Sequence, residues 1–197
     1  NAGLNHLLAS LLLKGTTQRD ALAIAETLED LGASIRPSSG NNSFMLSSYC
    51  LRDDLSQVID LLSEIISEPL FPGDSIERER AAMIAGLEES LEDPASRAFR
   101  EMRSHLWSNE GYGIPSSGTH ESLASLNRLA LSAQHSRYFV ASNMATAFFG
   151  DLDPDRTIIQ LENTLGKLPT GSPGKLSSPD CDTHGEHSFQ LNKEQAV

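Results

Sequence analysis

The sequence predicts one α+β domain, in which an antiparallel or mixed sheet packs against several helices. Three observations indicate this class. Apolar residues recur at helical spacing in several separate segments, for example from Leu55 to Ile66. Two short strand-like runs flank a turn sequence at Ser39–Asn42. The 197 residues are enough for one domain with a sizeable core.

The composition is that of an ordinary globular protein and argues against two classes of partner. Hydrophobic residues make up 39 % of the chain and charged residues 21 %. The net charge of −12 argues against binding to nucleic acid or to an anionic membrane surface. The simplest role of this charge is solubility, although it would also suit a chamber that accepts basic peptides. No apolar run is long enough to span a bilayer, so no membrane insertion is expected.

Both ends of the sequence indicate a piece of a longer protein. It opens directly in a helix, and the strand-like Glu194–Val197 is its last segment, while Asn1 and Ala2 resemble a cloning remnant. A signal peptide would then lie outside the sequence, and the choice between the bacterial periplasm and the cytoplasm stays open. Two cysteines are too few for a disulfide framework, and Cys50 is expected to be a buried thiol.

The first helix is predicted within Gly3–Arg19, the stretch on which the functional argument depends. Leucines cover most of its circumference, so we expect it to be buried. Its only ionisable side chain within the apolar run is His6, which by itself would be an ordinary core or helix-edge histidine. The sequence Lys14-Gly15-Thr16 ends the helix. The leucines are Leu4, Leu7, Leu8, Leu11, Leu12 and Leu13.

A second helix and a hairpin follow. Asp20 provides a polar start, apolar residues recur at helical spacing up to Leu31, and Gly32 suits the position just after a helix. The segments Ala33–Arg36 and Ser43–Cys50 are rich in strand-forming residues and are separated by a turn. We therefore expect them to pair.

The second half of the chain alternates helices with loops. Prolines and glycines mark the connections, and Ser75 is the expected N-cap of a long charged helix. Helices are predicted at Leu55–Ile66, from Ile76 to about Leu91, from Pro94 through Trp107, at Leu126–Phe139, and from Asp153-Pro154 to about Leu168; a buried strand is predicted at Ala145–Asp151 and a further strand at Phe189–Val197.

The order and spacing of several motifs resemble one known family, the pitrilysin/insulinase/mitochondrial-processing-peptidase family of zinc metallopeptidases. The resemblance covers residues 3–197 as a single module, with 169–187 as a linker-like loop, and implies the fold of a metallopeptidase half-module. The matching motifs are G-x-x-H at Gly3–His6, Lys14-Gly15-Thr16, the hairpin phrase Leu31–Phe44, the loop Gly111–Thr119, and Gly150-Asp151 before Asp153-Pro154.

In that family the first helix carries the inverted zinc motif H-x-x-E-H. Two histidines at i and i+4 ligate zinc, and the glutamate between them activates the bound water. At the same five positions here, His6 matches the first zinc ligand of the motif. Ala9 stands where the general base would be, and Ser10 stands where the second ligand would be.

The third ligand of the family is a glutamate on a later helix, and its position falls at Gly86. Glu88 and Glu89 are near in sequence, but a shift of two or three residues turns them away around the helix. With one ligand of three and no general base, the resemblance implies no catalytic residue, no bound cofactor and no metal in this domain.

The resemblance further implies what such a module does. Family members pair homologous modules into a clamshell chamber in which only one module holds zinc. We therefore expect a catalytically inactive module, a pseudoenzyme, that forms chamber wall and binds peptide substrate beside a separate active module. That partner module, in the same chain or in a partner subunit, would hold the zinc. The third module of a single-chain bacterial enzyme and a stand-alone inactive subunit fit equally.

Two alternatives remain open at this point. Relatives of this fold also act as core subunits of a respiratory complex without proteolysis, and a purely structural or assembly role needs only an intact fold. Alternatively, the domain could be a zinc hydrolase with a non-standard site at residues 181–187, where Cys181, His184 and His187 stand close together. This second alternative is weaker, because the stretch is linker-like and offers nothing to orient the rings.

Overall fold

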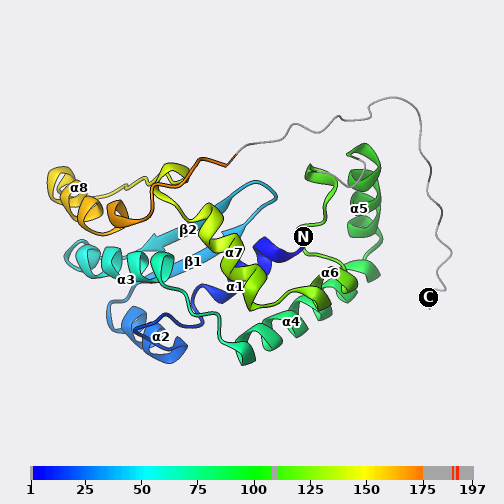
Figure 1. The fold of residues 1–197 in the computed structure, drawn as a ribbon, viewed down its shortest axis with the longest axis horizontal. Coiled ribbons are helices and arrows are strands. Elements are labelled where there is room, and N and C mark those ends of the chain that lie inside the picture. Colours follow the sequence, from blue (N-terminus) through cyan, green and yellow to red (C-terminus); the bar gives the residue numbers. More distant parts are fainter. Residues whose placement is uncertain (1, 108–110, 175–187, 189, 191–197) are drawn as a thin grey trace.

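The fold is described from a computed structural model, which describes residues 2–107, 111–174, 188 and 190. It is an α+β domain in which helices surround a small antiparallel sheet (Figure 1), as the sequence predicts. The elements are α1 Leu4–Leu11, α2 Ala21–Asp30, β1 Ser34–Ser39, β2 Phe44–Tyr49, η1 Arg52–Asp54, α3 Leu55–Ser67, α4 Gly73–Glu92, α5 Pro94–Leu106, η2 Gly111–Gly113, α6 His120–Ser125, α7 Arg128–Tyr138, η3 Ala141–Asn143, α8 Pro154–Asn163 and η4 Leu165–Lys167.

The predicted first helix is confirmed as the centre of the core. In α1, Leu7, Leu8 and Leu11 are completely buried. The helix packs against α4, α7 and β1, so apolar neighbours surround it on several sides. This explains why leucine occupies nearly every side of it, since each buried leucine contributes about 2 kcal/mol of hydrophobic stabilisation.

The predicted hairpin is also confirmed. β1 and β2 pair antiparallel, with Ser34 opposite Tyr49 and Ser39 opposite Phe44. The turn closes with a 2.8 Å hydrogen bond from the Gly40 amide to the Ser43 carbonyl. Among the described residues these two strands form the whole sheet.

The prediction of a buried strand at Ala145–Asp151 is wrong. The segment is extended, but it pairs with no strand of the described chain, and Phe149 is 93 % exposed. One exposed ion pair, from Arg52 Nη1 to Asp151 Oδ2 at 2.7 Å, ties it to η1, the short helix before α3. Its apolar composition reflects strand propensity, and propensity alone cannot supply a neighbouring strand.

Most helices begin close to the residues at which the sequence predicts them to begin. Asp20 and Asp93 accept hydrogen bonds from the amides of Ala23 (2.8 Å) and Ser96 (2.7 Å), which are normal N-cap contacts. The predicted cap at Ser75 is wrong, because α4 already begins at Gly73. The first helical bond of α4 is accepted by the Pro72 carbonyl, so Ser75 lies one turn inside the helix and is buried there.

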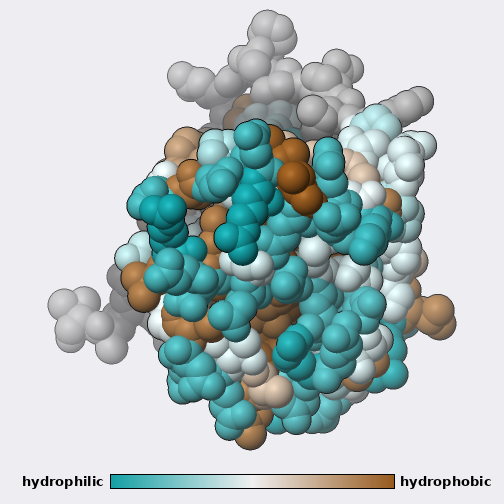
Figure 2. Space-filling model, turned by 90° about the vertical axis from the view of Figure 1, so that its left-hand side faces the viewer, coloured by the Kyte–Doolittle hydropathy of each residue, from teal (hydrophilic) through white to brown (hydrophobic). Residues whose placement is uncertain are grey.

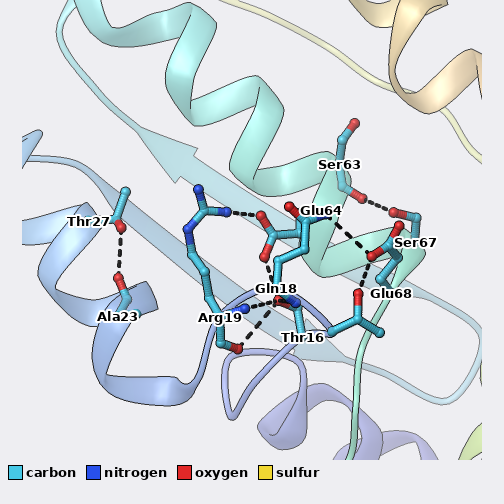
Figure 3. A network of polar contacts seen from close by, with 10 residues as sticks. Thr16, Gln18, Arg19, Ala23, Thr27, Ser63, Glu64, Ser67 and Glu68 are labelled. Atoms are coloured by element: carbon cyan, nitrogen blue, oxygen red, sulfur yellow. Dashed lines mark hydrogen bonds and ion pairs between the residues drawn. The ribbon is translucent and has the colours of Figure 1, made fainter.

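A polar network fixes the loop after α1 to the end of α3 (Figure 3). Glu64 on α3 is 7 % exposed, and its carboxylate accepts from the Thr16 hydroxyl and pairs with Arg19. The neighbouring Glu68 accepts from Thr17 at the exposed edge of the same contact. The loop therefore has one buried and one exposed anchor on the same helix.

His135 on α7 is half-buried and lies at the edge of the core beside α3. Its ring stacks on Phe139 with centroids 4.6 Å apart and meets the edge of Phe71 at 6.0 Å. Nε2 lies 2.7 Å from the Ile66 carbonyl oxygen, and because a carbonyl can only accept, Nε2 carries the proton. Burial lowers the pKa of His135 below its ordinary value, and the bond to Ile66 opposes this only in part.

We expect the free energy of unfolding to fall as the pH drops from 7.5 to 5.5. In this window an unfolded His135 binds a proton near its ordinary pKa, whereas the folded protein binds it only at lower pH, so stability is lost by at most about 1.4 kcal/mol per pH unit. Urea unfolding of His135→Gln should show a smaller acid dependence. The exposed His120→Gln serves as the control and should behave as the parent chain.

Polar side chains cover much of the surface that Figure 2 presents. Figure 2 shows a face that is mostly hydrophilic, with separate hydrophobic patches between polar side chains. No helix of the described chain combines the length and the apolar character that crossing a membrane requires.

Candidate functional site

The positions singled out by the sequence lie on α1 and α4. His6 is exposed on α1, whereas Ala9, one turn along, is 5 % exposed and belongs to the core. Ser10 is half-buried, and its hydroxyl donates a 3.0 Å hydrogen bond to the Leu7 carbonyl. The Ser10 hydroxyl is thus engaged with its own helix backbone.

The helix α4 packs against α1. Lys14 Nζ, in the turn after α1, lies 2.8 Å from Glu79 Oε1 on α4. Gly86 lies in α4 and is exposed. A Cβ atom at this position would have no heavy atom within 4 Å, so open space exists there for a side chain. Glu88 and Glu89 follow in the same helix, and both are exposed.

The residues present at these four positions do not fit a zinc ion. Alanine and glycine offer no side-chain donor atom, and the only group of a type that commonly ligates zinc is the imidazole of His6. Within the described ranges, no three His, Cys, Asp or Glu side chains gather in a way that could hold a metal ion. Cys181, His184 and His187, the alternative site, lie outside the described residues.

The one described cysteine is no candidate nucleophile. Cys50 is half-buried rather than fully buried as the sequence predicts. Burial, and to a lesser degree the charge of Asp54, raises the pKa of its thiol. A raised pKa keeps the sulfur protonated at neutral pH, and a thiol is a poor nucleophile compared with a thiolate.

Sequence reasoning missed a polar bridge between the hairpin turn and the loop after α5. The Asn41 side chain donates to the carbonyl oxygens of Gly111 (3.3 Å) and Ile114 (2.9 Å). Arg103 Nη2 in turn donates to Asn41 Oδ1 at 3.1 Å. The only signal for this bridge in the sequence is an asparagine in a turn, which is equally typical of an isolated turn.

Comparison with known proteins identifies the family of this chain. The model of the family described as Insulinase (Peptidase family M16) matches residues 1–120, and the one described as Peptidase M16 inactive domain matches residues 125–196. The chain belongs to peptidase family M16. The sequence-based resemblance to the insulinase and processing-peptidase group is confirmed.

Individual relatives of this M16 chain carry both peptidase and non-peptidase names. An uncharacterized zinc protease of Rickettsia felis is 22 % identical over 169 residues, covering 86 % of this chain and 41 % of that protein. The non-peptidase homolog YmxG of Helicobacter pylori is 26 % identical over 169 residues, covering 86 % of this chain and 39 % of that protein.

The solved structures agree with the family assignment. The peptidase M16 inactive domain from Pseudomonas fluorescens superposes with a TM-score of 0.82 at 26 % identity, covering 90 % of this chain and 44 % of that one. The M16 chain therefore spans about two fifths of the length of the relatives it matches. In those relatives it corresponds to one part of a larger peptidase-family protein.

Proposed function

We propose that this M16 chain is a catalytically inactive module of a zinc metalloendopeptidase. It forms part of the chamber wall and contacts the peptide substrate beside a separate, homologous module that holds the zinc. The observation that carries the proposal is the residue set on α1 and α4. Ala9 has no carboxylate to activate water, and Gly86 has no side chain to ligate a metal.

The comparisons support the proposal from a second direction. The second half of the chain matches a family description that contains the words "inactive domain". Relatives named zinc proteases are more than twice the length over which this chain matches them, which leaves room for a second module in those proteins. An inactive module and an active partner together would account for both kinds of name.

The first experiment is the zinc content of the purified chain, measured by elemental analysis after gel filtration without chelator, beside a casein-peptide cleavage assay. We expect neither zinc nor cleavage. Stoichiometric zinc would overturn the proposal, and the variants Cys181→Ser and His6→Ala would then locate the metal. Cysteine and histidine are the ligand types that each variant removes.

A non-proteolytic role of the whole protein is the second candidate. It is favoured by the relative of Helicobacter pylori that is named a non-peptidase homolog. The two functions differ in one feature, which is an intact H-x-x-E-H module in the same or a neighbouring gene. Sequencing the flanking DNA distinguishes them, because an assembly subunit needs no such neighbour.

A further inference from the structure

The connection between α3 and α4, residues 68–72, contains a strained backbone position. Phe71 has a φ of 50°, and among the described residues it is the only one other than glycine with a positive φ. In this left-handed conformation Cβ lies close to a carbonyl oxygen, which costs free energy for a bulky residue. Pro72 follows it, and a residue that precedes proline favours extended backbone. Phe71 is therefore held against two local preferences.

The ring of Phe71 gives one reason why this conformation persists. The side chain is 2 % exposed and belongs to the core cluster. Its ring meets the ring of His135 on α7 edge to face, with centroids 6.0 Å apart. Because burial of an aromatic side chain is one of the larger contributions that a single residue makes to a core, it offsets the backbone strain.

Two side chains of α7 hold carbonyl oxygens at this connection. Arg128 Nε donates a 2.8 Å hydrogen bond to the carbonyl of Phe71, and His135 Nε2 donates to that of Ile66. Ile66 lies in the last turn of α3, where carbonyls have no acceptor role within the helix. Arg128 and His135 are seven residues apart and so lie on the same side of α7. One helix thus fixes the chain both before and within the connection.

The place of Arg128 in its own helix is unfavourable. It is the first residue of α7, where the positive end of the helix dipole repels a cation. The helix itself therefore gains nothing electrostatically from an arginine at this position. The hydrogen bond to the strained residue gives Arg128 a role that lies outside α7.

The chain on the two sides of Phe71 belongs to different parts of the domain. Before it, the Leu70 amide donates a 3.0 Å hydrogen bond to the Gly15 carbonyl in the loop after α1. After it, the Pro72 carbonyl accepts from the Ile76 amide at 2.9 Å, which is the first helical bond of α4. A rotation of the backbone at Phe71 would move the start of α4 relative to that loop.

We propose that Phe71 is a hinge at which the start of α4 opens, and that Arg128 is the residue that keeps it closed. In the open state Phe71 relaxes to a negative φ, its ring leaves the core, and the first turn of α4 frays while α1 stays folded. Phe71 then joins Leu70, which is 50 % exposed in the closed state, in one apolar surface. The domain thus has a second, locally open state built into the α3–α4 connection.

Hydrogen exchange of the Ile76 amide, followed by NMR on the 197-residue chain, tests the role of Arg128. Arg128→Met keeps an unbranched side chain and removes the donor. We expect Ile76 to exchange about tenfold faster or more, because a hydrogen bond from a charged donor is lost, while the α1 amides keep their rates. The control is Arg137→Met on the same helix, whose guanidinium lies over the Tyr138 ring and which should leave Ile76 unchanged.

A second pair of variants tests the strain at the hinge. Phe71→Ala and Phe71→Gly both remove the ring, but only glycine adopts a positive φ without a steric cost. At an ordinary position glycine is the less stable of the two, so a reversed order is specific to a left-handed residue. We expect the Ile76 amide to exchange about threefold more slowly or less in Phe71→Gly than in Phe71→Ala.

Three results would overturn the proposal. Equal exchange of Ile76 in Arg128→Met and Arg137→Met would show that Arg128 does not hold the hinge closed. Greater protection in Phe71→Ala than in Phe71→Gly would show that the position is not strained. Equal acceleration of Ile76 and of the α1 amides in Arg128→Met would indicate global unfolding without a hinge. The two arginine variants leave the ring in place, so they decide the question even if the Phe71 variants do not fold.

Discussion

The triple variant Ala9→Glu, Ser10→His, Gly86→Glu is expected to bind one zinc ion per chain in excess of the parent. His6 and the new histidine would stand at i and i+4 on the same side of α1, and the new glutamate on α4 would supply the third ligand. The structure favours this outcome at Gly86, where a side chain has open space. Elemental analysis and a zinc titration measure it.

The control for this experiment is the same variant with His6→Ala, which should lose most of the acquired zinc affinity. Ala9 is nearly buried, so circular dichroism must first show that the new glutamate at this position is tolerated. A triple variant that folds as the parent does and takes up no additional zinc would show that α1 and α4 do not occupy the zinc positions of the family.

Glu64→Ala is expected to lower the free energy of unfolding by about 3 kcal/mol. The substitution removes a nearly buried carboxylate that accepts from Thr16 and pairs with Arg19. The buried Thr16 hydroxyl would lose its acceptor, and the loop after α1 would lose its inner anchor on α3. Urea unfolding followed by circular dichroism gives the value.

Glu68→Ala is the matched control, because Glu68 lies one turn further along the chain and anchors the same loop from an exposed position. Its effect should be much smaller, as is usual for exposed charged contacts. Equal losses for the two variants would mean that burial does not determine the strength of these anchors. If the Thr16 hydroxyl and the Glu64 carboxylate act together, the double variant Thr16→Val, Glu64→Ala should lose less stability than the sum of the two single variants.

Local patterns predicted most of the helices and the hairpin. The leucine content of α1 predicted a buried helix because burial on several sides demands apolar residues on several sides. Asp20 marked a helix start because an N-cap contact involves residues only three apart. The assignment of His6, Ala9, Ser10 and Gly86 as degenerate zinc-motif positions rested on the family motif and stays a prediction.

Features that depend on distant partners could not be predicted. The strand at Ala145–Asp151 was expected from its apolar composition, yet no described strand lies beside it. The contacts of Glu64 with Thr16 and of Arg103 with Asn41 join residues 48 and 62 positions apart. Nothing in the local sequence distinguishes these side chains from solvated polar residues.

The weak packing of α5 determines where the domain first unfolds locally. None of its residues is fully buried, and Phe99 and Met102 are 63 % and 42 % exposed. It stands at the edge of the domain in Figure 1, packed mainly against α4 and η2. Because little apolar surface holds α5, we expect it to detach at a lower free-energy cost than α1, whose amide hydrogens should exchange with solvent only when the whole domain unfolds. Limited proteolysis should therefore begin in α5 while the leucine core remains intact.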